Sequence, residues 1–301
     1  MRNRLSEYKK PMPFLRKYIG FIFILPALVL HLCVVMIPSV STFVMSFFDW
    51  NGLKSPSFIG IDNFIEIFAE DKVVWIAFKN NLIWMLIFLI VPLIAGLFVA
   101  TLVVRLRHGQ MLYRTAIFMP YVLSAVIAAK LWESIVNPYY GFPVIFEAIG
   151  FDSLSKILWL GDPSIALFTV AFVDNWHWWG FVMVLFVAAL HQVDEDLYEA
   201  VRIEGATKIQ EFWYVTLPGI KPTFIFIISM SIMWSFTTFD YIWAMTQGGP
   251  GQATEILSTW IYKNSFTMFR SGYASALCVV QSTLVLIAFI VMRILGKGAE
   301  E

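Results

Sequence analysis

The sequence predicts an all-α polytopic membrane protein with six transmembrane helices. Hydrophobic residues make up 59% of the 301 residues and charged residues only 14%, whereas a soluble domain carries about 25% charged residues. The mean hydropathy of +0.74 agrees with this assignment. A helix needs about 20 apolar residues to cross the hydrocarbon. The segments that meet this requirement are 18–47, 79–104, 114–136, 164–190, 222–246 and 272–294.

The first span follows a short basic tail, residues 1–17, which we expect in the cytoplasm. A basic start followed by apolar residues is also typical of a signal peptide. The run from Tyr18 to Phe48, however, contains no Asp, Glu, Lys or Arg. It is much longer than the apolar region of a signal peptide, about 7–15 residues. We therefore expect a retained first span, a transmembrane domain over 18–294 and a cytoplasmic tail over 295–301.

The next spans differ in how free of charge they are. Residues 80–104 and 271–292 carry no charged side chain. The segment 114–136 contains Lys130 and Glu133 near its outer end, and we expect them either to pair at i and i+3 or to snorkel to the membrane surface. Cytoplasmic loops collect Lys and Arg. Most Lys and Arg fall on one side if both chain termini and residues 105–114 and 191–221 are cytoplasmic.

The loops on the other side are longer and aromatic, over 48–78, 137–163 and 247–271. We expect short amphipathic helices over 63–68 and 142–149. Gly248-Gly249-Pro250 predicts an abrupt loop after the fifth span. This loop is either a plain turn or a contact for a binding partner.

The most informative segment is the polar stretch 191–221 between two spans. Its residues Glu199, Ala200, Ile203, Ala206 and Thr207 recur at helical spacing, which predicts a short helix. Gly205 can adopt a positive φ and form a tight turn. Pro218 and Pro222 are expected to stop the helix or to reset its direction before the fifth span. The stretch therefore predicts a helix–turn–helix at the membrane surface, suited to docking another protein.

This stretch closely resembles the EAA loop of ABC importer permeases. The matching residues are Glu199, Ala200, Gly205, Ala206, Phe212, Leu217 and Pro218. Val201 replaces the second Ala of the family pattern, and Glu204 stands where Asp is common. Further similarity to sugar-transporting, MalF-like permeases lies in residues 58–64, in Thr246–Pro250 and in Ala253-Thr254-Glu255.

The resemblance implies the type I ABC importer permease (MetI-like) fold and a non-catalytic membrane subunit. Such a subunit forms half of the pathway of an ATP-driven, binding-protein-dependent importer for a sugar or oligosaccharide. It needs no cofactor of its own, because ATP and Mg are bound by partner subunits. The implied partners are a second homologous permease, two ATP-binding subunits and an extracytoplasmic solute-binding protein. The implied location is the bacterial inner membrane, surrounded by lipid.

The resemblance also assigns roles within the loop. The segment with Glu199, Ala200, Gly205, Ala206, Leu217 and Pro218 would couple the permease to the ATPase. Glu199 would accept charged hydrogen bonds from the ATP-binding subunit, which are stronger than neutral ones. Gly205 would set the bend.

Two polar and aromatic stripes on the fourth and fifth spans are candidates for the substrate pathway. Ser231, Ser235 and Thr238 share one helix face, as do Asp174, Trp178 and Phe181. In the related maltose permease the corresponding positions line the substrate site. The simpler interpretation is that Ser and Thr allow close helix packing. A carboxylate at membrane depth usually faces a cavity or a partner, and both remain open for Asp174.

Other functional classes fit less well. A net charge of zero argues against nucleic acid as a partner. An ion-coupled secondary transporter would use carboxylates near the midplane, and only Asp174 qualifies. An intramembrane enzyme would need a catalytic pair or metal ligands, and His177 lacks a second ligand at i+3 or i+4.

Overall fold

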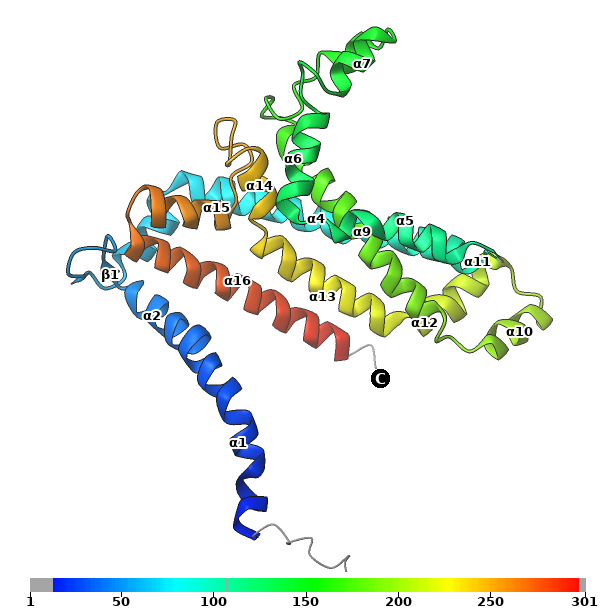
Figure 1. Cartoon of the computed structure of the whole chain (residues 1–301), viewed down its shortest axis with the longest axis horizontal. Helices are drawn as coiled ribbons and strands as arrows, with labels where there is room; N and C mark the ends of the chain where they lie inside the picture. Colours follow the sequence, from blue (N-terminus) through cyan, green and yellow to red (C-terminus); the bar gives the residue numbers. More distant parts are fainter. Residues whose placement is uncertain (1–12, 107, 298–301) are drawn as a thin grey trace, which may run out of the picture.

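The computed structural model describes residues 13–106 and 108–297. Its centre is a bundle of long apolar helices (Figure 1). Helix α4 (Lys72–Val104) packs against α9 (Ala166–Leu190) and α13 (Lys221–Thr237), and α16 (Ser271–Lys297) packs on α13. The main core cluster joins α4, α9 and the segments around them, with Trp84, Phe88 and Phe186 fully buried.

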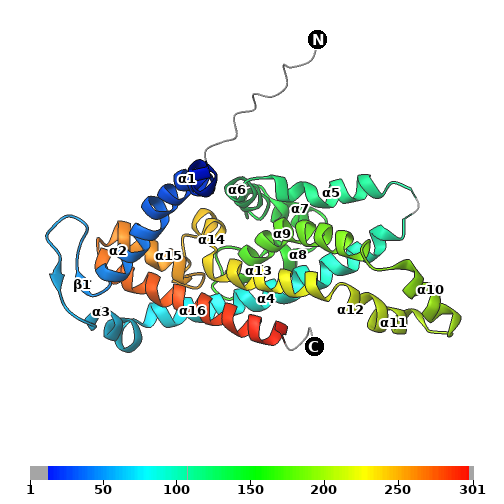
Figure 2. The same ribbon diagram turned by 90° about the horizontal axis from the view of Figure 1, so that it is seen from below.

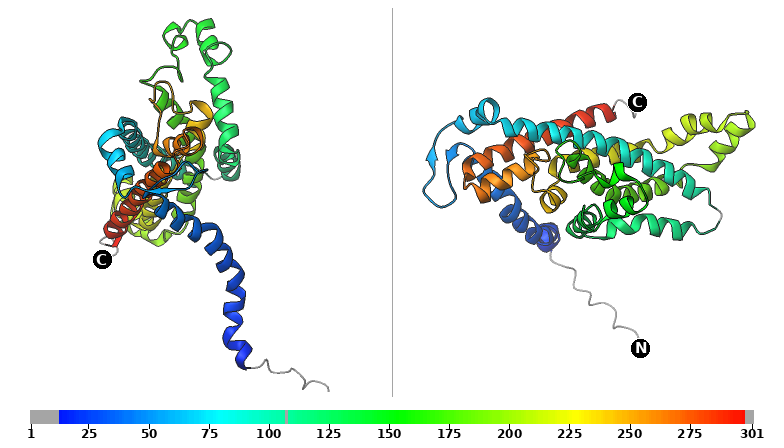
Figure 3. Two further views of the ribbon diagram at one scale, coloured as in Figure 1. Left: turned by 90° about the vertical axis from the view of Figure 1, so that its left-hand side faces the viewer. Right: turned by 90° about the horizontal axis from the view of Figure 1, so that it is seen from above.

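The first span leaves this bundle. It consists of α1 (Pro13–His31), the π-helical turn η1 (Leu32–Met36) and α2 (Ile37–Met45). Only α2 packs on α16, and α1 projects away from the other helices (Figures 1 and 3). In the most apolar stretch of this span, which lies within Gly20–Met45, no residue is buried against the described part of the chain. Its apolar surface is therefore available to lipid or to another chain.

Short elements cover the end of the bundle where α4 and α16 begin. Strand β1 (Phe48–Asp49) pairs antiparallel with β2 (Ser57–Phe58). The expected helix over 63–68 is present as α3 (Asp62–Ile65) and η2 (Glu66–Glu70). Asp71 then caps α4 by accepting hydrogen bonds from the backbone N–H groups of Val73 and Val74. The same end carries α15 (Leu257–Tyr262) and η4 (Lys263–Thr267).

The third span is broken, which corrects the expectation of one helix over 114–136. Helix α5 (Gln110–Val122) meets α6 (Ala125–Ile135) at 95°. Pro120 lacks an N–H and weakens the last turn of α5, and Ser124 caps α6 by accepting from the N–H of Ile127. The expected Lys130–Glu133 ion pair is present on α6 at 2.6 Å.

Beyond α6 the chain makes a long excursion. It contains α7 (Phe142–Ala148), which confirms the helix expected over 142–149, and α8 (Asp152–Ser155). Figure 3 shows α7 at the far end of this excursion, away from the bundle.

The fifth span is also broken, so the prediction of one helix over 222–246 is wrong at its end. Helix α13 stops at Thr237, and α14 (Asp240–Met245) follows in a new direction. Side chains from other elements satisfy the carbonyls freed at this break. Asn81 donates to the carbonyl of Ser235 at 2.9 Å, and Ser258 and Gln281 donate to the carbonyl of Phe236.

Within the described residues, four helices are long and apolar enough to cross a membrane. Two bent helix pairs raise the number to as many as six if each pair is one span. One pair is α5 with α6, and the other joins the segment Lys208–Gly219 to α13. The range of four to six includes the predicted six. The segment after α9 lies at the opposite end of the bundle from β1 (Figure 2). It contains α10 (Glu195–Ile203), α11 (Lys208–Glu211), η3 (Phe212–Thr216) and α12 (Leu217–Gly219).

Candidate functional site

The predicted helix–turn–helix is present at residues 194–219, which we call the hairpin. Asp194 caps α10 by accepting from the N–H of Asp196. The helix ends at Ile203, earlier than expected, so Ala206 and Thr207 lie outside it. Gly205 follows with φ +83°, and the N–H of Ala206 donates to the carbonyl of Val201 at 3.0 Å. A left-handed glycine after the last turn is a common helix ending.

Thr207 has a different role from the one its spacing indicated. It is the N-cap of the second helix, and it forms a capping box with Gln210. The N–H of Thr207 donates to the Gln210 side chain at 2.8 Å. The two helices of the hairpin are therefore each capped, and the turn between them is defined by its own residues.

A buried carboxylate joins the two helices. Glu211 accepts two hydrogen bonds of 3.1 Å from the Arg202 guanidinium and one of 2.9 Å from the Lys208 ammonium. These bonds, led by those from Arg202, lower the pKa of Glu211 to about 2. Arg202 and Lys208 are therefore both paired within the hairpin. We call Arg202, Lys208 and Glu211 the hairpin clamp.

The second half of the hairpin continues further than expected. Pro218 lies in the first turn of α12 and does not stop the chain. The chain bends by 69° only at Ile220, between α12 and α13, and Pro222 lies in the first turn of α13. Both prolines occupy positions where the missing N–H has no helical partner to lose.

The hairpin exposes several of the predicted coupling residues. Glu199, Ala200 and Pro218 are exposed, and Ala206 and Leu217 are partly buried. Two large apolar side chains flank the turn, with Ile203 87% exposed and Ile209 72% exposed. Glu199 and Ile203 are one turn apart on α10, so they share a face. We call Glu199, Ile203 and Ile209 the hairpin tip; of these three residues, only Glu199 was predicted from the sequence to contact a partner.

The six pathway candidates lie where α9 meets α13. Asp174 is fully buried, and the indole N–H of Trp234 donates to its Oδ2 at 3.1 Å. Trp178 stacks on the Trp234 ring at 5.5 Å and contacts Phe181 at 5.0 Å. The structure therefore brings the polar and aromatic stripes together, through a tryptophan that the sequence argument did not use.

The hydroxyl stripe is enclosed in this conformation. Ser231, Ser235 and Thr238 are all buried, and the Ser235 hydroxyl donates to the carbonyl of Ser231 at 2.6 Å. Several buried polar atoms around Asp174 have no hydrogen-bond partner among the described residues. They include Asp174 Oδ1, Ser231 Oγ, Trp178 Nε1 and Tyr241 OH. Such groups are rare in protein interiors and call for water or a ligand.

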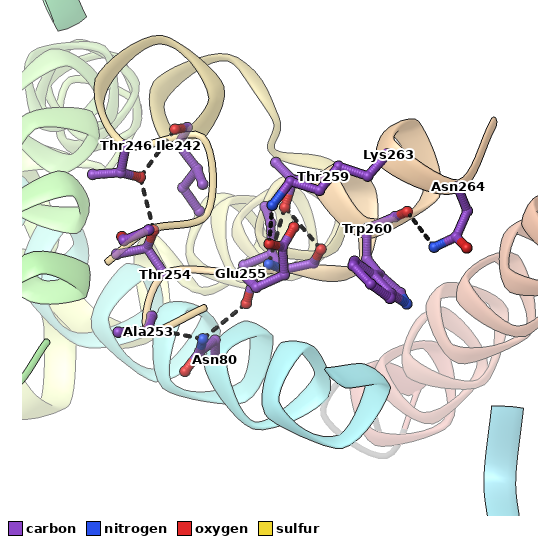
Figure 4. A network of polar contacts seen from close by, with 12 residues as sticks. Asn80, Ile242, Thr246, Ala253, Thr254, Glu255, Thr259, Trp260, Lys263 and Asn264 are labelled. Atoms are coloured by element: carbon purple, nitrogen blue, oxygen red, sulfur yellow. Dashed lines mark hydrogen bonds and ion pairs between the residues drawn. The ribbon is translucent and has the colours of Figure 1, made fainter. Parts of the chain in front are cut away.

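A second polar network lies in the loop after α14 (Figure 4). Asn80 donates to the carbonyls of Ala253 and Glu255 at 3.0 and 2.8 Å. Glu255 is fully buried and forms an ion pair with Lys263. A Cβ on Gly248, whose φ is +85°, would lie 2.2 Å from Glu255 Oε2. A larger residue at position 248 would therefore need a left-handed backbone and a shift of the Glu255–Lys263 ion pair.

These anchoring residues were not predicted from the sequence, although the sequence contains a signal for them. Asn80, Asn81 and Gln281 are polar residues inside charge-free apolar segments. Polar residues at membrane depth are costly and usually have a partner. Their partners, the carbonyls at span breaks and loops, depend on the fold and could not be named in advance.

Comparison with known proteins identifies the family to which this sequence is similar. Residues 83–301 match the family described as "Binding-protein-dependent transport system inner membrane component". The chain is 35% identical over 290 residues to the probable ABC transporter permease protein YurN of Bacillus subtilis, covering 95% of this chain and 98% of that one. It is 29% identical to the trehalose/maltose transport system permease protein MalF of Thermococcus litoralis, covering 99% of each.

The fold also matches a solved importer. A bacterial ABC transporter involved in the import of the acidic polysaccharide alginate superposes with a TM-score of 0.83 at 22% identity, covering 94% of this chain and 96% of that chain. The fold is thus the type I importer permease fold expected from the hairpin motif. The chain belongs to the inner-membrane permease components of binding-protein-dependent ABC transport systems.

Proposed function

We propose that this chain is the permease subunit of an ATP-driven importer for a sugar or oligosaccharide, and that it performs no chemistry itself. The hairpin is the observation that carries the proposal. It is a capped, clamped helical pair that extends from one end of the bundle and exposes Glu199, Ile203 and Ile209. Exposed large apolar residues beside a charge are typical of a docking site.

Two ATP-binding subunits, which hold ATP and Mg, would dock on the hairpin tip of this chain and of a second homologous permease. A subunit that responds to ATP must bind differently in the two transport states, because only a difference in affinity can shift a conformational equilibrium. The clamp suits this role, since a rigid hairpin passes a displacement of its tip on to α9 and α13.

The hairpin side would face the cytoplasm of a bacterial cell, together with both chain termini. An extracytoplasmic solute-binding protein would then deliver the sugar at the end that carries β1 and α15. Membrane lipid or the partner permease would cover the apolar surface of α1 and α2, which the rest of this chain leaves exposed.

The substrate pathway would run beside Asp174, Trp178, Phe181, Ser231, Ser235 and Thr238. The unpartnered atoms around Asp174 offer both donors and acceptors, as sugar hydroxyls require. The stacked Trp178 and Trp234 rings offer an apolar surface for a sugar ring. None of the six residues is basic, which favours a neutral sugar. The relative named for trehalose and maltose transport agrees with this substrate class.

Membership of an ABC permease family favours ATP-driven transport over the ion-coupled secondary transporter considered from the sequence. The test uses the chain co-expressed with its ATP-binding subunits. The double variant Glu199→Ala, Gly205→Pro should lose co-purifying ATP-binding subunits and vanadate-sensitive ATP hydrolysis, while the chain still inserts in the membrane. Ile145→Asp, an exposed position on α7, serves as the control and should retain both. Unchanged association in the double variant would rule out the coupling role.

A further inference from the structure

The breaks in the third and fifth spans lie close together. The first falls at Leu123 and Ser124, between α5 and α6, and the second at Thr238 and Phe239, between α13 and α14. Beyond the breaks, α6 and α14 pack against each other and against α9. Two short helices, each joined to its span by a break, thus share one neighbour.

His177 on α9 bonds directly to the first break. Its Nε2 lies 2.9 Å from the carbonyl oxygen of Leu123. A carbonyl can only accept, so Nε2 carries the proton and donates. Leu123 is extended, with ψ 150°, and its carbonyl has left the helical ladder. A freed carbonyl at membrane depth needs a donor, and His177 supplies it.

The same ring reaches the second broken span. The His177 ring lies 5.9 Å from the ring of Tyr241 in an edge contact, and Tyr241 is fully buried on α14. The His177 ring also lies 5.3 Å from the ring of Tyr121. Tyr121 is on α5, three residues before Ser124. His177 therefore touches α5, the first break and α14 at once.

Close packing of α9 against α5 fixes the position of His177 relative to α5. Gly180 lies three residues further along, and a Cβ there would be 2.2 Å from the backbone carbonyl oxygen of Ile117 on α5. The backbones of α9 and α5 are thus in close contact one turn from His177. A side chain on such a support holds its position while the short helices beyond the breaks move.

We propose that His177 is a positioning residue that links the α5–α6 break to α14, so that α6 and α14 move together when the transporter changes state. This inference rests on the proposed function and deepens it. It assigns no contact with substrate to His177. Its imidazole would couple the movement of α6 in the third span to that of α14 in the fifth span.

The test uses the complete complex of permeases and ATP-binding subunits in lipid bilayers. His177→Phe keeps a ring of similar size and removes the donor, whereas His177→Gln restores an N–H donor of similar reach. His108→Phe, at an exposed histidine in the turn before α5, is the matched control. The first readout is ATP hydrolysis without binding protein. His177→Phe should raise it about fivefold or more, the lower range of a typical coupling free energy, and His177→Gln should restore the low rate.

The second readout is the distance between spin labels at Ser134 on α6 and Asp240 on α14, both exposed, with and without ATP and vanadate. The unsubstituted complex and His177→Gln should each show one distance that shifts on trapping. His177→Phe should show a broad distribution. Equal behaviour of His177→Phe and the unsubstituted complex, or equal loss in the Phe and Gln variants, would overturn the inference. A labelled complex that neither hydrolyses ATP nor responds to trapping would instead refute the proposed function.

Discussion

The hairpin clamp gives the prediction with the clearest physical basis. Replacing Glu211 by Gln keeps the shape of the side chain and removes its charge. The carboxylate is only 8% exposed, while the side chains of Arg202 and Lys208 are 51% and 65% exposed. Hydrogen bonds to charged groups contribute about 1.5–3 kcal/mol each when desolvated. Solvent around the two cations strongly reduces this contribution. We therefore expect the Glu211→Gln change to lower the stability of the folded hairpin by about 2 kcal/mol, for the three bonds together.

A loss of about 2 kcal/mol raises the population of an opened hairpin about 30-fold, since about 1.4 kcal/mol corresponds to tenfold. Hydrogen exchange of the backbone amides of α10 and α11 measures this opening directly. Glu204→Gln, which changes an exposed carboxylate beside the turn, is the matched control and should leave exchange unchanged. Equal protection in the Glu211 and Glu204 variants would refute the clamp.

The clamp also predicts a pH dependence. The pKa of Glu211 is about 2 in the folded hairpin, against an ordinary value of 4.5. A lowered pKa stabilises the folded state fully above 4.5, and this contribution is lost as the pH falls from about 4.5 towards 2. The opening constant of the hairpin, which is the exchange rate divided by the intrinsic rate at the same pH, should therefore be constant between pH 6 and 8 and should rise below pH 4.5. The Glu211→Gln variant should lack this acid-dependent component.

Three glycine positions give further predictions. Gly205→Ala should destabilise the hairpin by about 1–2 kcal/mol, because φ is +83° with open space around it; Gly205→Asn should recover part of this in the same exchange assay. Gly248→Ala should lower the thermal unfolding midpoint more than Gly251→Ala, since both have positive φ but only position 248 meets Glu255. Gly180→Ala should lower it too, because the added Cβ would meet the backbone of α5; a midpoint equal to the unsubstituted chain would show that α5 and α9 can separate freely.

The parts of the fold that follow from local chemistry could be predicted. Long apolar runs located the spans because no water is available there to satisfy the backbone. The spacing from Glu199 to Pro218 predicted the hairpin, and Gly205 has the positive φ expected of it.

The breaks could not be placed in the same way. The segments around Leu123 and Thr238 are apolar on both sides, so hydropathy continues through them. Pro120 and Ser124 were local signals for the first break. The stability of each break depends on donors distant in sequence, namely His177 for one and Asn81 with Gln281 for the other.

In the candidate site, too, local spacing predicts some residues, whereas others depend on contacts between residues distant in sequence. Spacing identified Asp174 and the hydroxyl stripe, but not Trp234, which bonds to Asp174 from 60 residues away. Likewise the pairing of Glu211 on α11 with Arg202 on α10 spans a tight turn, and helical spacing alone does not predict it.

The central claim is that the hairpin tip docks on an ATP-binding subunit. It is tested most directly by placing a photoreactive amino acid at position 203 in intact membranes that contain the whole complex. Position 145 on α7, at the far end of the outer excursion, is the matched control. The account predicts a cross-link from position 203 to the ATP-binding subunit and none from position 145. A cross-link to that subunit from position 145, with none from position 203, would contradict it.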